Sequence, residues 1–365
     1  MKDSYNPKER EMRFFYNLKG IIRHITPRFI PQSLLDSKIK GIFKRFSLES
    51  LKPRLEFYNK LNSHFDMIKN ANELPQSCNF NERFNDKLPS VPSRLANLKI
   101  VKPDFATLGE NSLKSGTAYY YDSYEFSRYF SDKLRWCHLF HDVNELVSYP
   151  AIVKSRPIFP HNETSVLLKL DKHRHFHFIK DSIKYENKKN ILLFRGAVHQ
   201  GHRLNFFHKH FSNKRCDIGH VGNVADYNKA FLKPAMSIKE QLNYKFLLSL
   251  EGFDVGSNLK WILSSNSLCI MPPPQIETWF MESSLRPGVH YGEIALDYSN
   301  LDCVLDYYLT RESEAKEIIE NAHIFCSQFF NPHLESALNF LVLRKYFYLS
   351  NQIDVLPIEQ ELYES

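Results

Sequence analysis

The stretch FLLSLEGFDVGSNLK, residues 246–260, joins a largely apolar run to a loop with two glycines and then to the start of a helix. The apolar run, Phe246–Leu250, predicts a strand that is buried on both faces. Ser257 is a residue type that often caps helices, so we expect a helix over Asn258–Leu263. This order of strand, loop and helix is the repeating unit of a parallel sheet covered by helices.

The chain continues the same alternation on both sides of this stretch. Two further apolar runs predict strands over Ile191–Phe194 and Leu268–Met271, and another strand is expected over Tyr291–Leu296. Helices are expected to follow, over Leu301–Leu309, Glu312–Phe329 and Leu334–Leu349. The pattern predicts an α/β fold with a parallel, doubly wound sheet, in which ligands bind beyond the carboxyl ends of the strands.

The glycine-containing loop could bind an anion. Gly256 and Ser257 precede the expected helix, whose first backbone N–H groups favour a phosphate together with the helix dipole. Asn258 and Lys260 lie in its first turn, and the ammonium of Lys260 could reach the same anion. The loop has neither a Walker A nor a G-x-G-x-x-G sequence, which disfavours an ATPase or a dehydrogenase. A structural connection without a ligand would explain the loop equally well.

A second cationic loop follows the strand Ile191–Phe194. Arg195 and Gly196 come directly after this strand, and Arg203 lies eight residues beyond Arg195. An arginine at the carboxyl end of a parallel strand points into the ligand crevice, although many such arginines make surface ion pairs. Two neighbouring loops with cations and N–H donors would suit a diphosphate leaving group. The chain has no Asp-x-Asp, so we expect protein cations, and no metal, to balance the phosphate charge.

The composition is that of a globular protein with length for two domains. The chain has 365 residues, of which 43% are hydrophobic. No apolar run approaches the roughly 20 residues of a membrane span, and the charged N-terminus lacks a signal-peptide core. Six cysteines are scattered without a C-x-x-C pair: Cys78, Cys137, Cys216, Cys269, Cys303 and Cys326. This pattern indicates free thiols in a reducing compartment, so we expect a cytoplasmic protein.

Positive charge is concentrated at the beginning of the chain. Residues 1–60 contain 14 Lys/Arg and 6 Asp/Glu, a net charge of +8, whereas the whole chain carries +7. Apolar residues recur there at helical spacing, over residues 14–25 and again over 39–46, among basic residues. Such helices could lie on an anionic membrane surface, or could pack on the domain with a solvated basic face. We expect no nucleic acid as partner, because no recognised nucleic-acid motif accompanies the charge.

Two features of the middle of the chain could carry chemistry. A strand is expected over Ala118–Tyr121 and a helix near Tyr124–Phe130, which makes Asp122 either an acid at a strand end or a helix cap. Three histidines alternate along the chain and would share one face of a strand: His173, His175 and His177. They could bind zinc, but a polar strand face that lines a crevice is the simpler interpretation, and we expect no metal site.

From Tyr119 to the C-terminus the sequence resembles glycosyltransferase family 90, the capsule-associated and protein O-glucosyltransferase-like enzymes, in particular a bacterial lipopolysaccharide-modifying branch. Order and spacing of short motifs carry the resemblance: Val153–Ile158, Phe194–Gly196 with Arg203, Ser257–Trp261, Ser264–Ser267 and Pro287–Tyr291. It implies a GT-B fold with two Rossmann-like domains. The acceptor domain would comprise residues 1–186 and the UDP-sugar domain residues 187–330, and a C-terminal helix within 331–365 would cross back to the first domain.

The resemblance also implies roles for individual residues. The nucleotide-sugar site would contain Arg195, Gly196, Arg203, Gly256, Ser257, Asn258, Lys260 and His290. Eukaryotic members have arginines at two positions where this chain has Val198 and Asn258. The family also has an Asp upstream of Tyr149-Pro150 that accepts the proton of the acceptor hydroxyl. Asp122 is our candidate for this base, and Glu110 and Asp142 remain possible.

We therefore expect an inverting glycosyltransferase that needs neither metal nor cofactor. It would transfer a sugar from a UDP-sugar to a hydroxyl of a lipopolysaccharide or capsular glycan at the inner membrane face. The alternative is a non-catalytic membrane-surface or nucleic-acid-binding protein that uses the basic N-terminus.

Overall fold

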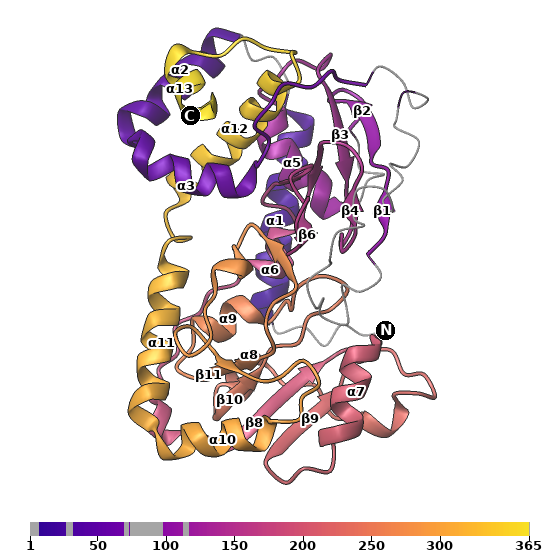
Figure 1. Cartoon of the computed structure of the whole chain (residues 1–365), viewed down its shortest axis with the longest axis vertical. Helices are drawn as coiled ribbons and strands as arrows, with labels where there is room; N and C mark the ends of the chain where they lie inside the picture. Colours follow the sequence, from indigo (N-terminus) through magenta and orange to yellow (C-terminus); the bar gives the residue numbers. More distant parts are fainter. Residues whose placement is uncertain (1–6, 27–31, 69–72, 74–97, 112–116, 365) are drawn as a thin grey trace. The chain divides into compact units, whose positions relative to one another are not determined.

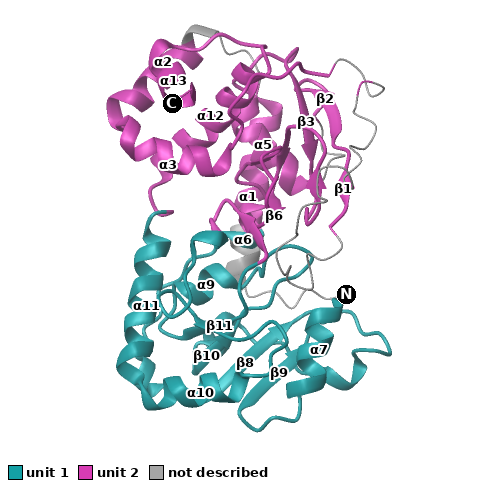
Figure 2. Ribbon diagram, in the orientation of Figure 1, with its two compact units in different colours: residues 1–11, 174–274, 282–328 teal, residues 12–173, 275–281, 329–365 magenta. Residues whose placement is uncertain are grey.

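A computed structural model describes residues 7–26, 32–68, 73, 98–111 and 117–364, with side chains except those of residues 7–12 and 32–33. The chain divides into two compact units, which Figure 2 colours separately. Unit 1 comprises residues 1–11, 174–274 and 282–328, and unit 2 comprises residues 12–173, 275–281 and 329–365. Among the described helices, none combines the length and the apolar character needed to cross a membrane.

Unit 1 is built on a five-stranded parallel sheet (Figure 1). Its strands are β8 (Lys189–Gly196), β9 (Cys216–His220), β10 (Tyr244–Leu248), β11 (Leu268–Met271) and β13 (Gly292–Glu293). The order across the sheet is β13-β11-β10-β8-β9, and every neighbouring pair is parallel. The chain thus moves from β8 to one side for β9, and to the other side for β10. The predicted parallel α/β sheet is confirmed, and β9 is an additional strand that the sequence did not reveal.

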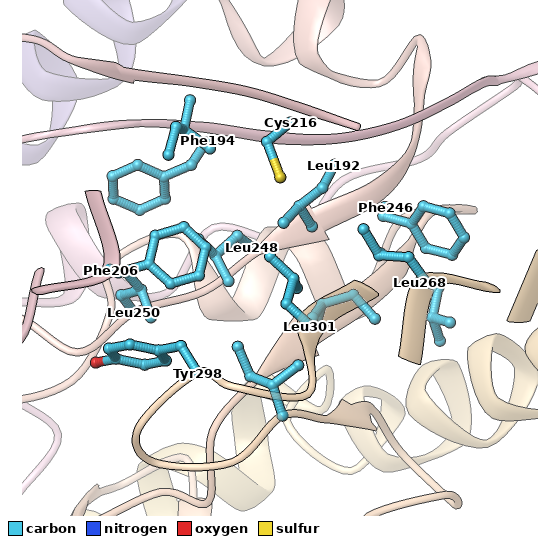
Figure 3. Packing of buried hydrophobic residues seen from close by; sticks show 14 of the residues in the cluster. Leu192, Phe194, Phe206, Cys216, Phe246, Leu248, Leu250, Leu268, Tyr298 and Leu301 are labelled. Carbon is cyan, nitrogen blue, oxygen red and sulfur yellow. The ribbon is translucent and has the colours of Figure 1, made fainter. Parts of the chain in front are cut away.

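Helices of unit 1 cover this sheet and form its core. They are α7 (Gly201–His210), α8 (Ile238–Gln241), α9 (Leu259–Leu263), α10 (Leu301–Thr310) and α11 (Glu312–Ser327). Leu192 and Phe194 lie two residues apart on β8 and therefore face the same side of the sheet. There they belong to one buried cluster with Phe206 of α7 and Leu301 of α10 (Figure 3). The expected helices after residue 300 are confirmed.

Unit 2 contains a second, smaller sheet. Its strands are β2 (Asp104–Thr107), β3 (Arg135–Leu139), β5 (Ala151–Val153) and β7 (Ser165–Leu167), in the order β2-β3-β5-β7. The last three run parallel to one another, and β2 pairs antiparallel with β3. Two strand pairs complete the unit's β structure: β1 (Ile100–Val101) with β4 (Leu146–Val147), and β6 (Ser155–Pro157) with β12 (Ile276–Thr278).

The helices of unit 2 come from both ends of the chain. The N-terminal helices are α1 (Pro7–Ile25), α2 (Gln32–Arg45) and α3 (Leu48–Tyr58), as the sequence predicted, and α1 begins before the unit does. The others are α5 (Thr117–Ser127), the four-residue α6 (Lys172–His175) at the unit boundary, α12 (Pro332–Leu349) and α13 (Pro357–Glu364).

Two local predictions for the middle of the chain are wrong. Ala118–Tyr121 is not a strand but part of α5, in which the rings of Tyr120 and Tyr124 stack at a centroid distance of 5.1 Å. Residues four apart meet on a helix, so these tyrosines favour the helix once they can pack together. The histidine-rich segment is not a strand either, because it forms α6 and an irregular stretch after it.

Paired charges hold the helices of unit 2 together. On α12, the buried Glu335 accepts hydrogen bonds from Arg54 of α3 and from Lys169, each at 2.6 Å. Glu335 also accepts from the indole N–H of Trp279, whose ring stacks on Tyr58 at 3.7 Å. Trp279 is therefore a core residue. Arg156, in one of the family motifs, is fully buried with Glu277 and thus serves the fold.

One buried lysine on α12 makes stability depend on pH. Burial lowers the pKa of Lys345 to about 8 from its usual 10.5, and its ammonium donates to the carbonyl of Asn59 at 3.1 Å. The unfolded chain binds more protons than the folded one between these values, so stability rises as pH rises from about 8 to 10.5. The shift corresponds to about 3 kcal/mol.

We predict that Lys345→Met removes this rise. At pH 7 the variant is more stable than the wild type. This difference in the free energy of unfolding decreases by up to about 3 kcal/mol as the pH rises to 10.5. Urea unfolding at both pH values measures the difference, with Lys133→Met, at an exposed lysine, as the matched control. A stability difference that stays constant over this pH range would contradict the prediction.

Candidate functional site

The ends of β8 and β10 mark the place where the connections of the unit 1 sheet diverge. Numbered along the chain, the sheet has the order 2-1-3-4-5, in which the first and third strands, β8 and β10, are neighbours. Their following connections leave to opposite sides, and in sheets of this order a ligand crevice is expected beyond the two carboxyl ends. Nucleotide and phosphate ligands of such sheets bind there. The two loops that the sequence singled out, after Phe194 and after Leu248, both begin at this point.

Arg203 of α7 ties these two loops together. Its Nη1 donates to the carbonyl of Ala197, which follows β8, at 2.6 Å. Its Nη2 and Nε donate to the carbonyls of Leu250 and Glu251, which follow β10, at 2.6 and 2.8 Å. The guanidinium is nearly buried, and carbonyl dipoles accept all three hydrogen bonds. The structure therefore places Arg203 at the expected crevice, where it fixes the separation of the loops and contributes positive charge.

The glycine loop folds back on the end of β10. A Cβ on Gly256 would lie 2.8 Å from Ser249 Oγ and 3.0 Å from the carbonyl of Leu250, so only glycine fits there. Asn258 Nδ2 donates to the carbonyl of Leu248 at 2.9 Å, while its Oδ1 accepts from Ser249 Oγ at 3.1 Å. Asn258 thus takes a structural role at a position where eukaryotic members of the resembled family have arginine.

The predicted helix cap at Ser257 is wrong. Helix α9 begins at Leu259 and Asn258 occupies the cap position, but its side chain makes no capping hydrogen bond because it is bonded to the end of β10. Ser257 is exposed in the turn before it. At five residues, α9 is also shorter than expected. The loop backbone, and not the dipole of this helix, is therefore the feature that bears on anion binding.

The two other cations expected at the site are neutralised by carboxylates. Arg195, at the end of β8, donates to Asp217 Oδ1 of β9 at 2.8 Å and to the carbonyl of Pro234 at 3.2 Å. Lys260 of α9 is completely buried and donates to Glu282 Oε1 at 2.7 Å. Both cations therefore form ion pairs within the protein, Arg195 with Asp217 and Lys260 with Glu282.

A polar layer at the ends of β8 and β9 was not anticipated. Val198 is buried, and its N–H donates to His220 Nδ1 at 3.0 Å while its carbonyl accepts from Asn228 at 3.1 Å. His199 Nδ1 lies 3.0 Å from the hydroxyl of Tyr227, and burial lowers the pKa of His199. The backbone hydrogen bonds of Val198 therefore position the loop. Val198 is the second position at which eukaryotic members of the resembled family have arginine.

Gly196 and His290 complete the expected set. Gly196 is the last residue of β8, and its carbonyl accepts from the N–H of Val221 after β9 at 3.1 Å. His290 Nδ1 accepts from the N–H of Arg286 at 2.9 Å, and burial lowers the pKa of its ring. His290 precedes β13, whereas the crevice loops follow their strands, so the sheet does not bring His290 together with the loops after β8 and β10.

The three candidate carboxylates all belong to unit 2, and Asp122 is the most buried. It lies on α5 with no exposed surface, and its Oδ2 accepts from the backbone N–H of Lys172 at 2.8 Å. The ammonium of Lys172 is 3.3 Å from the other oxygen. Burial raises the pKa of Asp122, and the charge of Lys172 opposes that shift. Asp122 therefore lies inside α5, where it forms an ion pair with Lys172 of α6, and it is not a helix cap.

Glu110 and Asp142 are more accessible. Glu110 Oε2 accepts from the N–H of Thr107 at 2.7 Å, so its carboxylate closes a turn, and this hydrogen bond lowers its pKa. The side chain of Asp142 is 24% exposed and accepts hydrogen bonds from the buried Lys154 and, at 3.2 Å, from the hydroxyl of Tyr119. Asp142 thus presents a carboxylate that two partners hold in place and that a substrate can still reach.

The histidine-rich segment does not assemble a metal site in the part of the chain that the structure describes. His173 stacks on Tyr16 at 5.0 Å, and its Nδ1 lies 3.3 Å from Asp171. Across the described residues, no group of three or more His, Cys, Asp or Glu side chains is arranged to hold a metal ion.

Comparison with known proteins places this chain in a family. The model of glycosyl transferase family 90 matches residues 171–350, which include all five strands of unit 1 and α12. A protein named O-glucosyltransferase LpsA, from Dichelobacter nodosus, is 34% identical to the chain over 349 residues. That alignment covers 93% of this chain and 98% of the relative. The chain belongs to glycosyl transferase family 90. The resemblance seen in the sequence motifs is confirmed, and the chain is a glycosyltransferase by family.

The geometry of Arg203 predicts that arginine is needed at this position. Arg203→Ala leaves three carbonyl groups without their donor, which we expect to destabilise the protein by about 2 to 4 kcal/mol. Arg203→Lys does not restore it, because one ammonium cannot reproduce the fork geometry. Urea unfolding measures both variants, and full stability of Arg203→Lys would show that the bridge between the loops is not needed.

The buried pair of Lys260 and Glu282 predicts a different pattern. Lys260→Met removes the cation from the buried carboxylate of Glu282 and should cost about 3 to 5 kcal/mol, whereas Lys260→Met combined with Glu282→Leu should recover most of the loss. Thermal and urea unfolding of the single and double variants tests this coupling. Additive losses in the double variant would contradict the ion pair.

Proposed function

We propose that this family 90 enzyme transfers a sugar from a UDP-sugar to a hydroxyl of a lipopolysaccharide or capsular glycan, with inversion and without a metal ion. The bridge that Arg203 makes between the loops after β8 and β10 is the observation that carries the proposal. The name of the relative, O-glucosyltransferase, supports glucose as the first sugar to test. We also propose the GT-B type, with the nucleotide-sugar bound by unit 1 and the acceptor by unit 2.

The donor diphosphate would lie against the glycine loop, residues 252–258. Arg203 supplies positive charge beside this loop, where its guanidinium donates to the carbonyls of Ala197, Leu250 and Glu251. Negative charge develops on the UDP as the bond to the sugar breaks, so a fixed cation stabilises the transition state. The absence of Asp-x-Asp from the sequence supports a protein-based rather than metal-based stabilisation.

Asp142 is the base we propose for the acceptor. In the reaction its carboxylate takes the proton of the acceptor hydroxyl while the oxygen attacks the anomeric carbon. The bond from that carbon to the diphosphate breaks on the opposite face, UDP leaves, and the configuration inverts. The accessible carboxylate of Asp142, held by Lys154 and Tyr119, suits this role, whereas the buried Asp122 lies out of reach of a substrate and serves to position α5.

We propose the cytoplasm as the compartment. The five cysteines in the described part of the chain are free thiols, which suits a reducing environment, and Cys78 lies outside the described residues.

The donor class is tested by thermal shift of the full-length protein with UDP, GDP, CMP and UDP-sugars. We expect UDP and UDP-glucose to raise the melting temperature and EDTA to leave the UDP effect unchanged, because the charge is balanced by the protein. A shift with GDP or CMP but none with UDP would overturn the donor assignment, and a UDP effect abolished by EDTA would overturn the metal-independent mechanism.

The base is tested by two isosteric variants. Asp142→Asn should lower kcat by roughly a factor of 100 to 10,000 with little change in KM for the donor, because the proton acceptor is lost. Asp122→Asn should retain kcat within about tenfold, and Glu110→Gln is the matched control at an exposed carboxylate. Steady-state kinetics with UDP-glucose measures all three. Loss of turnover in Asp122→Asn together with normal turnover in Asp142→Asn would reverse the assignment.

A further inference from the structure

Helix α1 packs on unit 2 through its polar side. The Tyr16 ring meets Tyr121 at 6.2 Å, and Gly20 lies so close to the same ring that a Cβ would come within 2.3 Å of it. Arg23 forms a 2.6 Å ion pair with Glu125 of α5. His24 adds a hydrogen bond to Tyr120 at 2.7 Å. These contacts come from one side of the helix and fix which side faces away from the unit.

The opposite side of α1 is apolar and exposed. Six large side chains lie there, each between 38% and 70% exposed: Phe14, Phe15, Leu18, Ile21, Ile22 and Ile25. Their spacing of one, four, seven, eight and eleven residues from Phe14 places them on one continuous stripe of the helix. A helix on a protein surface normally buries such a stripe and exposes its polar side. In α1 the arrangement is reversed, so the stripe is a surface for a partner.

Helix α2 shows the ordinary arrangement and serves as an internal comparison. Its apolar residues Leu35, Ile39 and Ile42 are buried, and Lys38 and Lys40 are exposed. Both segments have a basic amphipathic pattern in the sequence. Of these two described helices, only α1 has this apolar side uncovered in the structure. The stripe of α1 is therefore not a general property of the basic N-terminus.

Charge decides which partner fits the stripe. Residues 1–60 carry a net charge of +8, while the whole chain carries +7, so the positive charge accompanies the stripe. Lys19 is exposed on α1 beside it. A second copy of the chain docked through the same stripe would bring the two basic segments together and repel. An anionic lipid surface accepts apolar side chains at the level of its headgroups and attracts the surrounding lysines and arginines.

We propose that α1 docks this protein on an anionic lipid membrane, with the stripe from Phe14 to Ile25 inserted among the headgroups and acyl chains. The helix lies in the plane of the interface and does not cross the bilayer. Because the polar side of α1 packs against Tyr121 and is bonded to Tyr120 and Glu125, the membrane orients unit 2 through a fixed helix. This docking is independent of which nucleotide-sugar the protein binds.

Vesicle co-sedimentation of the full-length protein tests the docking. The vesicles contain phosphatidylcholine alone, or phosphatidylcholine and phosphatidylglycerol in equal amounts. We expect binding to the anionic vesicles to be at least about tenfold stronger and to weaken with salt. The triple variant Phe14→Ser, Ile21→Ser, Ile25→Ser should lower this binding at least about tenfold, because three exposed apolar side chains no longer leave water.

Matched controls separate docking from general effects. Ile324→Ser removes an isoleucine of α11 that is 65% exposed and should leave vesicle binding unchanged. Lys19→Glu should weaken binding to anionic vesicles, whereas Lys214→Glu, an equal charge change at an exposed lysine of unit 1, should have a much smaller effect. Circular dichroism confirms that each variant is folded, which is expected because the replaced side chains are exposed.

The other occupants of the stripe give different results. Equal binding of wild type and triple variant to anionic vesicles would overturn the proposal. The absence of vesicle binding by the wild type would also overturn it. In that case, a concentration-dependent dimer that the triple variant abolishes would assign the stripe to a second copy of the chain. Sedimentation velocity without vesicles makes that distinction. Donor binding measured separately by thermal shift shows whether a variant has also lost the proposed nucleotide site.

Discussion

The bridge that Arg203 makes between two strand-end loops is the constraint on which the candidate site depends. The sheet order places β8 and β10 side by side, but their connections leave in opposite directions, so strand pairing alone does not fix the loops. One guanidinium bonded to Ala197, Leu250 and Glu251 supplies that constraint and brings positive charge to the same place. Structural and electrostatic roles therefore coincide in a single side chain, with planar geometry that lysine does not share.

Arg195 and Lys260 are the two other cations that were expected at the site. Arg195 and Lys260 each face a carboxylate, Asp217 and Glu282, which offsets the cost of placing an ammonium or guanidinium away from water. At Val198 and Asn258, where eukaryotic family members have arginine, backbone and amide hydrogen bonds hold the loops instead. Our proposal for the diphosphate therefore relies on the loop backbone and on Arg203 more than on a cluster of cations.

The sequence predicted what depends on local pattern and failed where distant residues decide. Apolar runs identified β8, β10 and β11, but β9 was missed because Asp217, Gly219 and His220 interrupt its apolar character. The strand predicted at Ala118–Tyr121 is helical, since the contact of Tyr121 with the distant Tyr16 of α1, together with the stacking of Tyr120 on Tyr124, outweighs the strand propensity of these tyrosines. Ion-pair partners such as Asp217 and Glu282 carry no local signal.

The N-terminal helices illustrate the same limit. An amphipathic pattern predicts a helix with two different sides, but it does not tell which side the protein covers. Only the contacts of Tyr16, Gly20 and Arg23 with α5 reveal that α1 turns its apolar side outward. The polar layer around His220 and Asn228 was likewise hidden, because those residues meet Val198 only after β9 joins the sheet.

Hydrogen–deuterium exchange of the full-length protein, with and without UDP, tests the central claim most directly, because it reports on the backbone of each loop. We predict that UDP slows hydrogen–deuterium exchange in the two loops that Arg203 joins, residues 196–203 and 249–258. The segments before β11 and β13, residues 264–267 and 286–291, should exchange at unchanged rates. Protection confined to those segments, or no protection by UDP in either crevice loop, would contradict the placement of the nucleotide between β8 and β10.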